Sequence, residues 1–246
     1  LVATEYHHTQ RLPGQLEVIA LFCALLIPHF CYFFRIFATT EVALPPHNYC
    51  FLPIIMKIAV YCSSRANLAP EFESVAVAAG KWIGTNRYEL VYGGVNAGLM
   101  HTVAQAAHDA GAIITGIVPK RFAYRADNIV DHLVKCRDLN DRKELMIDCV
   151  DAFIVLPGGL GTIDEWLSTL SILVVNNDSR RKIVVANIDG IFNSQISQIN
   201  ELANSPFARS EMLDMSIIAD SEQEMINRLN EIQKFFVTNI HSTDIL

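Results

Sequence analysis

The string Pro157-Gly-Gly-Leu-Gly-Thr-Ile-Asp-Glu165 places groups that can hold a phosphate next to a carboxylate that could do chemistry. Gly158, Gly159 and Gly161 carry no Cβ, so a phosphate can approach the backbone amides, and the helix expected to follow offers unpaired N–H groups. Thr162 can add a hydroxyl donor. The simpler interpretation is that these glycines only turn the chain tightly from a strand into a helix.

Two charged residues are candidates for chemistry beside this phosphate cradle. Glu165 is expected in the first turn of the helix after the loop, with its carboxylate facing the phosphate. Arg142, followed by Lys143, comes after the helix-starting run Asp138-Leu-Asn-Asp141, which follows an expected strand near Leu133–Cys136. Either charge alone is typical of a solvated surface. Together with glycine loops they form a candidate active site.

A further glycine-rich loop, Tyr92-Gly-Gly-Val-Asn-Ala-Gly-Leu-Met100, lies between an expected strand and an alanine-rich helix that should end near Gly111. Ligands of open parallel sheets bind at the carboxyl ends of strands, where such loops lead into helices. Neither loop continues into the Gly-Lys-Ser/Thr of a Walker sequence, which disfavours nucleoside triphosphate hydrolysis. Neither is a clean dinucleotide fingerprint with an acidic residue about 20 positions further on.

The elements that must position these loops are short apolar runs alternating with amphipathic helices. This alternation predicts one Rossmann-like, doubly wound α/β domain with a parallel sheet. In the first helix an apolar stripe recurs at helical spacing, and Gly84 stands where a C-terminal cap belongs. The last helix opens with the capping box Ser221-Glu-Gln-Glu224. The runs expected to form buried strands are Ile58–Cys62, Leu90–Tyr92, Ile113–Val118, Phe153–Leu156, Ile183–Ala186 and Ile217–Ala219.

Residues 1–55 differ in composition from the rest of the chain. The run Val18–Phe34 is uncharged and strongly apolar, but it is interrupted by a proline and is short for a membrane span of roughly 20 residues. Met56 is followed at once by a strand-like run. We therefore expect residues 1–55 to be upstream sequence or an artefact outside the fold, and residues 56–246 to be the folded domain. The alternative is a signal anchor or short span, the one case in which a membrane partner is expected.

Composition narrows the classes of partner and cofactor. The net charge of −7 disfavours nucleic acid, which normally binds a basic face. The six cysteines contain no Cys-x-x-Cys pair and no Cys/His cluster at metal-ligand spacing, a pattern that fits a reducing cytoplasm and no metal. His101 and His108 share an expected helix face, but no carboxylate lies in register with them. A solvated or packed histidine is therefore expected at both positions.

These motifs resemble, in the same order, those of the LOG family of nucleotide phosphoribohydrolases, once labelled "possible lysine decarboxylases". The matching motifs are Gly93-Gly94…Gly98-Leu-Met100, Asp141-Arg-Lys143 with Met146, and Pro157-Gly-Gly-x-Gly-Thr-x-x-Glu165, and the resemblance runs from about Met56 to the C-terminus. The sequence departs from the family pattern at Val95, where a third glycine is common. It also lacks a glutamate often seen just after Arg125, for which Asp127 could substitute.

The resemblance implies a Rossmann-like homodimer that releases a free base and ribose 5-phosphate from a purine nucleoside 5'-monophosphate. N6-prenyl adenine nucleotides are the best-known substrates of the family. Arg142 and Glu165 match its catalytic pair, and a carboxylate near the ribose C1' can stabilise developing positive charge or activate water. No cofactor or metal is required. The expected nucleotide-binding positions are Lys143, Gly158, Gly159, Gly161, Thr162 and Asp164, with Gly93, Gly94, Gly98 and Met100 of the first loop.

Two other functions remain open from the sequence. A nucleotide- or cofactor-binding protein without catalysis could use the same fold, although retention of both Arg142 and Glu165 argues against it. A DNA-processing role is disfavoured by the acidic balance. Within the enzyme reading, Met100, Trp166 and Leu170 are expected in the core rather than in a substrate pocket. The apolar helix Trp166–Val175 could pack on its own sheet or on a symmetry mate.

Overall fold

Seven short strands lie side by side in one parallel sheet, in the order β4-β3-β2-β1-β5-β6-β7. The structure is a computed structural model that describes residues 55–209 and 211–243. β1 occupies the centre, so the chain builds outward to β4 on one side, returns, and builds from β5 to β7 on the other. The strands are β1 (Lys57–Tyr61), β2 (Glu89–Tyr92), β3 (Ile113–Pro119), β4 (His132–Cys136), β5 (Ala152–Val155), β6 (Ile183–Ala186) and β7 (Ser216–Ala219).

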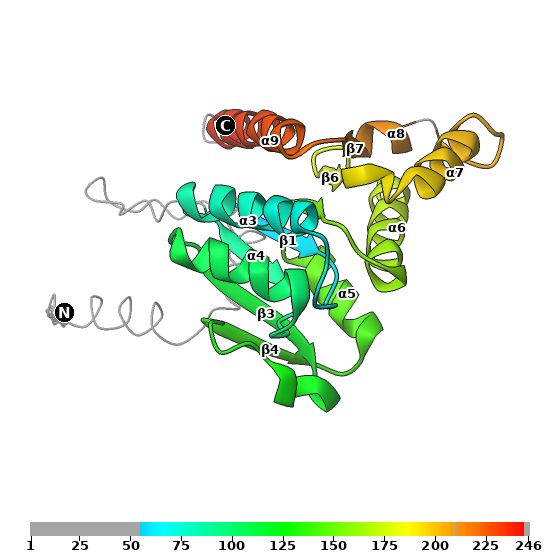
Figure 1. Ribbon diagram of the computed structural model, residues 1–246. Helices are drawn as coiled ribbons and strands as arrows, with labels where there is room; N and C mark the ends of the chain where they lie inside the picture. The colour runs from blue at the N-terminus through cyan, green and yellow to red at the C-terminus, as the bar shows by residue number, and fades with distance from the viewer. Residues whose placement is uncertain (1–54, 210, 244–246) are drawn as a thin grey trace, which may run out of the picture. The chain divides into compact units, whose positions relative to one another are not determined.

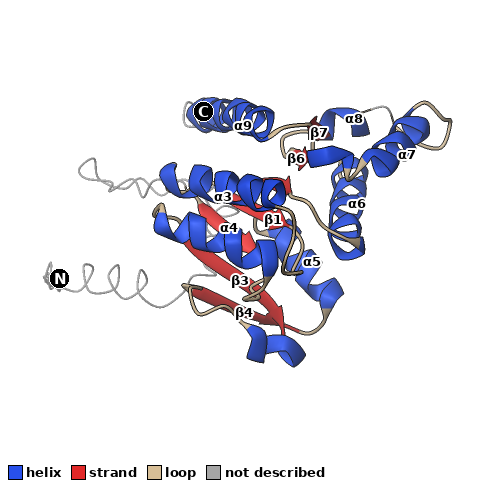
Figure 2. Cartoon of the chain, viewed as in Figure 1, coloured by secondary structure: helices blue, strands red, loops and turns tan. Residues whose placement is uncertain are grey.

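Helices cover both faces of this sheet (Figures 1 and 2). On one face α3, α4 and α9 pack over a core that includes Val60 and Leu99, and on the other α5 to α8 pack over a core that includes Tyr61 and Trp166. The predicted doubly wound, Rossmann-like α/β fold is therefore confirmed. The helices are α3 (Pro70–Thr85), α4 (Gly98–Asp109), α5 (Leu139–Asp148), α6 (Leu160–Val175), α7 (Asn193–Ala203), α8 (Met212–Met215) and α9 (Glu222–Thr243), with 3-10 turns η1 (Lys120–Arg125) and η2 (Ile188–Gly190).

The predicted strands form at the predicted places. β6 has the bounds read from the sequence, and each of the others begins or ends within a residue of its apolar run. β2, β5 and β6 are buried along their whole length and β1 at every position after Lys57, which explains the apolar runs in the sequence. The predicted capping box of α9 forms in part: Ser221 Oγ accepts a hydrogen bond from Glu224 N at 3.2 Å, whereas Glu224 Oε2 accepts from Asp220 N at 3.1 Å, one residue before the expected N–H of Ser221.

Gly84 does not cap α3 as predicted. The helix continues to Thr85, and the turn that follows is made by Arg87, whose φ is 56°. A Cβ on Gly84 would lie 2.4 Å from the backbone oxygen of Ala107 in α4, and Gly80, one turn earlier, faces α4 in the same way. The two glycines therefore allow the backbones of α3 and α4 to touch.

The N-terminal extension expected from the sequence falls on residues 1–54, which lie outside the described residues, and on residue 55. Among the helices that the structure describes, none combines the length and the apolar character needed to cross a bilayer.

Candidate active site

The carboxyl ends of β1 and β5 define the place where a ligand is expected. The connection after β1 leads to α3 on one face of the sheet, and the connection after β5 leads to α6 on the other, so the two diverge and leave a crevice between them. Ser63 lies at this point: its N–H donates to Pro157 O at 3.2 Å, and its carbonyl accepts from Met100 N at 3.3 Å. Both glycine loops are thus hydrogen-bonded to Ser63.

Sequence reasoning missed this segment. Ser63, Ser64 and Arg65 follow the central strand directly, and the rule that located the glycine loops, polar or small residues just after a buried strand, applies to them too. They carry no glycine and no paired charge, so nothing else singled them out. The structure adds them to the candidate site.

The loop after β5 contains glycines that differ in what surrounds them. A Cβ on Gly158 would lie 2.1 Å from Thr162 Oγ1, so this glycine is required by packing within the loop. At Gly159 and Gly161 a Cβ would meet no atom within 4 Å, so these two leave open space above the backbone. Gly159 is the N-cap of α6 and provides no side-chain hydrogen bond to the first amides. Those amides can therefore bind an anion.

The loop after β2 has a backbone conformation that needs glycine. Gly94 and Gly98 have φ of 68° and 52°, which side chains with a Cβ rarely adopt. A Cβ on Gly98 would also lie 2.2 Å from Arg65 O, so this glycine brings the first loop against the segment after β1. A Cβ on Gly93 would lie 3.1 Å from Met100 Sδ and 3.3 Å from an Arg142 guanidinium nitrogen. The first loop is thus close to the candidate catalytic arginine.

Arg142 and Glu165 are in direct contact. Asp138 caps α5, its Oδ1 accepting from Asp141 N at 3.0 Å, and this places Arg142 in the first turn of α5. An Arg142 Nη2 hydrogen bond reaches Glu165 Oε1. Glu165 is the sixth residue of α6, which begins at Leu160, so it lies in the second turn and not in the first as predicted. The two side chains are 13% and 5% exposed, so the pair is largely shielded from water.

The environment of the pair favours proton binding by the carboxylate. Burial raises the pKa of Glu165 above its ordinary value, and the positive charge of Arg142 and its hydrogen bond oppose that shift only in part. Arg142 Nε is buried and has no hydrogen-bond partner among the described residues, so it can donate to a bound molecule. A carboxyl group with a raised pKa beside a buried cation is suited to exchanging a proton and to stabilising charge.

A chain of hydroxyl groups fixes the backbone beneath Glu165. Thr169 Oγ1 lies 2.8 Å from the Glu165 carbonyl and must donate to it, because a carbonyl only accepts. The Tyr61 hydroxyl lies 3.0 Å from the same Thr169 oxygen, and it is therefore the donor in that contact. Both hydroxyl groups are buried, and they link the Tyr61 side chain at the end of β1 to the backbone of Glu165 in α6.

Lys143 and Asp164 pair with each other. Lys143 Nζ donates to both carboxylate oxygens of Asp164, at 3.1 and 2.8 Å, and lies 3.3 Å from Ser168 Oγ. This bridge joins α5 to α6 one residue away from the Arg142–Glu165 contact on each helix. Thr162 is buried, with its hydroxyl against Gly158. Lys143 and Asp164, both expected to bind a nucleotide, thus also link α5 to α6, the helices that carry Arg142 and Glu165.

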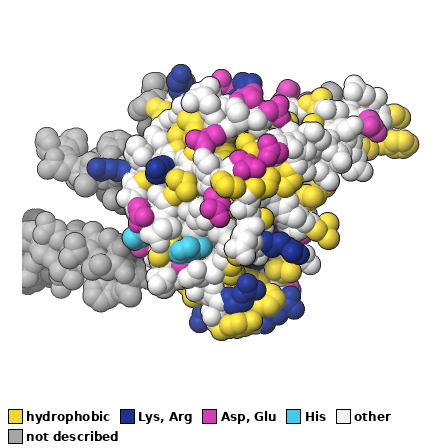
Figure 3. All heavy atoms as spheres, viewed as in Figure 1, with side chains coloured by type: hydrophobic (Ala, Val, Ile, Leu, Met, Phe, Trp, Pro, Cys, Tyr) yellow, Lys and Arg dark blue, Asp and Glu magenta, His cyan; other side chains and the backbone are white. Residues whose placement is uncertain are grey.

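Charge is unevenly distributed around the site. Lys120, Arg121 and Arg125 of η1 are exposed, and Arg125 O accepts from Asn96 N at 3.1 Å, which fastens this segment to the first glycine loop. In Figure 3, Lys and Arg side chains gather with hydrophobic ones at the lower end of the visible face, whereas Asp and Glu side chains spread over the upper part. The rim of the site near η1 is locally basic in an acidic chain.

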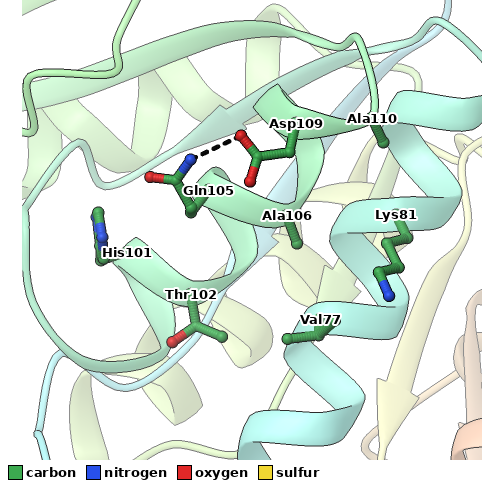
Figure 4. A pocket seen from close by; sticks show the side chains of 8 residues that line it. All are labelled: Val77, Lys81, His101, Thr102, Gln105, Ala106, Asp109 and Ala110. Carbon is green, nitrogen blue, oxygen red and sulfur yellow. Dashed lines mark hydrogen bonds between the residues drawn. The ribbon is translucent and has the colours of Figure 1, made fainter.

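The two histidines of α4 do have carboxylate partners, contrary to the sequence-based expectation. His101 Nδ1 lies 2.7 Å from Asp127 Oδ2, and His108 Nδ1 lies 3.3 Å from Asp109 Oδ1. His101 and Asp109 also line a depression of about 470 Å³ between α3 and α4, shown in Figure 4. That depression contains none of the residues of the glycine loops. Within the part of the chain that is described, no cluster of three or more His, Cys, Asp or Glu side chains could hold a metal ion.

Comparison with known proteins identifies relatives of the whole domain. The family described as "Possible lysine decarboxylase" matches residues 100–229. A cytokinin riboside 5'-monophosphate phosphoribohydrolase of Arabidopsis thaliana is 30% identical over 182 residues, which are 73% of this chain and 83% of the relative. A relative of the same description from Oryza sativa subsp. japonica is 30% identical over 177 residues, 71% of this chain and 73% of the relative.

Solved structures share the fold at lower identity. The molybdenum cofactor carrier protein of Chlamydomonas reinhardtii superposes with a TM-score of 0.57 at 17% identity, over 73% of this chain and 99% of the other. The molybdenum cofactor binding protein of Rippkaea orientalis gives a TM-score of 0.56 at 21% identity, over 72% and 97%. At these identities the likeness supports the fold alone.

Proposed function

This chain belongs to the LOG family, and from that premise we propose that it hydrolyses the N-glycosidic bond of a purine nucleoside 5'-monophosphate to the free base and ribose 5-phosphate. The observation that carries the proposal is the buried contact between Arg142 and Glu165, made beside the uncapped N-terminus of α6. An anion site and a reactive carboxylate are then on the same helix, less than two turns apart.

The 5'-phosphate binds at the start of α6. The open space above Gly159 and Gly161 lets phosphate oxygens reach the first amides, and the helix dipole adds positive potential there. Binding this remote group supplies energy that holds the ribose against Glu165. Unphosphorylated nucleosides are therefore poor substrates in this scheme.

Glu165 acts at the sugar and Arg142 at the departing base or the phosphate. As the C1'–N9 bond breaks, its electron pair leaves with the purine, and positive charge develops on the ribose that a carboxylate stabilises. Glu165 takes a proton from the attacking water, whose oxygen forms the new bond to C1', and that proton is returned to the purine. The raised pKa of Glu165 suits a group that accepts and returns a proton.

The test is a product assay. The protein is incubated with AMP, and free adenine and ribose 5-phosphate are separated by chromatography, with adenosine as the unphosphorylated control. We expect adenine from AMP, little from adenosine, and none from the Arg142→Ala variant. Binding of AMP without release of adenine would instead favour a non-catalytic nucleotide-binding protein, the second function that this fold supports.

The base is the finer part of the proposal. Relatives are described as cytokinin riboside 5'-monophosphate phosphoribohydrolases. The N6-prenyl adenine nucleotides expected from the family resemblance are therefore the first candidates. Met100, Trp166 and Leu170 are all buried in the core, and only Met100 adjoins the site. A panel of prenylated and unprenylated adenine, guanine and pyrimidine monophosphates, compared by kcat/KM, determines the preference.

A homodimer is part of the same proposal. The inward side of α6 packs on its own sheet through Trp166 and Leu170, but Leu160, Ile172 and Val175 are exposed on its outer side. A second copy could cover these exposed apolar side chains. Light scattering at several protein concentrations tests it, and a monomer at every concentration would contradict it.

A further inference from the structure

We propose that His101 and Asp127 form a positioning pair that holds the first glycine loop in the shape needed for the nucleotide. His101 Nδ1 and Asp127 Oδ2 are 2.7 Å apart, with the Asp127 side chain 0% exposed and that of His101 37%. An ionised carboxylate only accepts hydrogen bonds, so Nδ1 carries the hydrogen in this contact. The inference rests on the proposed function only where the readout is catalytic.

The buried carboxylate depends on this histidine. The other donor recorded for it within the described residues, Ile129 N, lies 3.5 Å from Oδ1, at the limit of a hydrogen bond. The Tyr92 phenol lies beside the same carboxylate without a hydrogen bond of standard geometry. Burial first, and then the charge of Asp127 and the interaction of the phenol with its side chain, raise the pKa of Tyr92, so the phenol stays neutral. His101 is thus the best-placed partner of this carboxylate, and a buried charge is destabilised when such a partner is removed.

Backbone contacts fasten the segment of Asp127 to the first glycine loop. Asp127 N donates to Gly94 O at 2.9 Å, Asn96 N donates to Arg125 O, and Val95 and Ala126 form an antiparallel bridge. The peptide groups on either side of Ala126, the residue before Asp127, are thus bonded to the loop, while the Asp127 side chain is bonded to His101 of α4. The contact between His101 and Asp127 therefore links the first glycine loop to α4, the helix that follows the loop, by a second route besides the chain itself. We call this closed set of contacts a ring.

The same ring reaches the candidate catalytic arginine. Met100 precedes His101 in the first turn of α4, and its sulfur and an Arg142 guanidinium nitrogen both lie within 3.3 Å of the point where a Cβ of Gly93 would be. A shift of the start of α4 therefore moves the side chain that packs beside Arg142. Neither His101 nor Asp127 contacts Glu165, so we assign them a positioning role and no part in bond breaking.

The experiment compares His101→Ala, His101→Asn and Asp127→Asn with a matched control, His108→Ala. Asn at 101 retains a side-chain N–H near the place of Nδ1, and Asn at 127 retains the acceptor without the charge. His108 is on the same helix and pairs with Asp109, but its side chain is 48% exposed and that of Asp109 is 64% exposed. The readouts are kcat and KM for AMP, the exchange rates of the Asn96 and Asp127 amide hydrogens, and the thermal midpoint.

We expect His101→Ala to raise KM about tenfold, the scale of a lost hydrogen bond to a charged group, with kcat changed much less. Exchange of the two amides should become faster, whereas His101→Asn should restore both readouts and His108→Ala should alter neither. Asp127→Asn should give intermediate values and guards against a His101→Ala protein that does not fold. Equal exchange and KM in His101→Ala and His108→Ala would overturn the inference. Lack of activity in the unmodified protein would refute the proposed function, and the amide exchange would still decide on the pair.

Discussion

The Glu165→Gln substitution keeps the size of the side chain and removes its charge. The carboxylate is 5% exposed and hydrogen-bonded to Arg142, so little water screens its action on a ribose bound beside it. Opposite unit charges about 4 Å apart at an effective dielectric constant of about 20 attract each other by about 4 kcal/mol. Loss of this attraction from the transition state should reduce the rate roughly 10³-fold. The ground-state ribose carries no charge, so the loss should fall on kcat and leave KM within about threefold of its original value.

The assay is release of adenine from AMP, measured under saturating and limiting substrate. Glu144→Gln makes the same chemical change on an exposed position of α5 and is the matched control. Glu144→Gln should leave the unfolding temperature unchanged, whereas Glu165→Gln should lower it, because Arg142 keeps a hydrogen-bond acceptor but loses its buried counter-charge. A Glu165→Gln enzyme with kcat within about tenfold of the original would refute the assignment, because a displaced water or a neighbouring acid would then account for the rate.

Gly158→Ala should lower the thermal midpoint by at least about 2–4 °C, because its Cβ would meet the Thr162 hydroxyl. Gly161→Ala should fold normally and raise KM for AMP, because a Cβ there enters the open space beside the first amides of α6. Calorimetry measures the first effect and kinetics the second, and equal stability of the two variants would contradict this account. The kcat/KM for AMP should fall as the pH is lowered, because the proposed base, Glu165, must be ionised. Burial raises the pKa of Glu165, so the apparent pKa of this fall should lie above the ordinary glutamate value of about 4.3. A kcat/KM that stays constant down to that pH would contradict the assignment. Gly84→Ala should cost about 1–3 kcal/mol of unfolding free energy in urea, and unchanged stability would remove the argument for close packing of α3 on α4.

The strands of the sheet could be predicted because a strand that is buried on both faces is apolar at almost every position. β5 and β6 are buried at every position, and no amphipathic helix produces such short runs bounded by glycine or polar residues. The glycine loops followed from their place after these strands. The family motifs then favoured catalysis over simple phosphate binding, a preference that glycines alone do not give.

Several features that the sequence did not reveal depend on contacts between elements far apart in the chain. A glycine near the end of an apolar stripe is typical of a helix cap, so the sequence predicts one at Gly84. The close approach of α4, which no local pattern indicates, shows that this glycine has a packing role instead. The carboxylate of His101 comes from Asp127, 26 residues further on, so helical register could not reveal it. The Lys143–Asp164 bridge likewise depends on the spacing between α5 and α6, which local pattern does not encode.

Ser63 is hydrogen-bonded through its N–H to the loop after β5 and through its carbonyl to the helix after β2. A residue held through the peptide groups on both of its sides permits no change in chain length, because one inserted residue would shift these two hydrogen bonds out of register. The connection between α6 and β6, around residues 176–180, is mostly exposed, and it forms local hydrogen bonds, to the end of α6 and to Arg181. Among relatives, differences in length should therefore collect around residues 176–180, and the segment 62–64 should keep the same number of residues even where its side chains change.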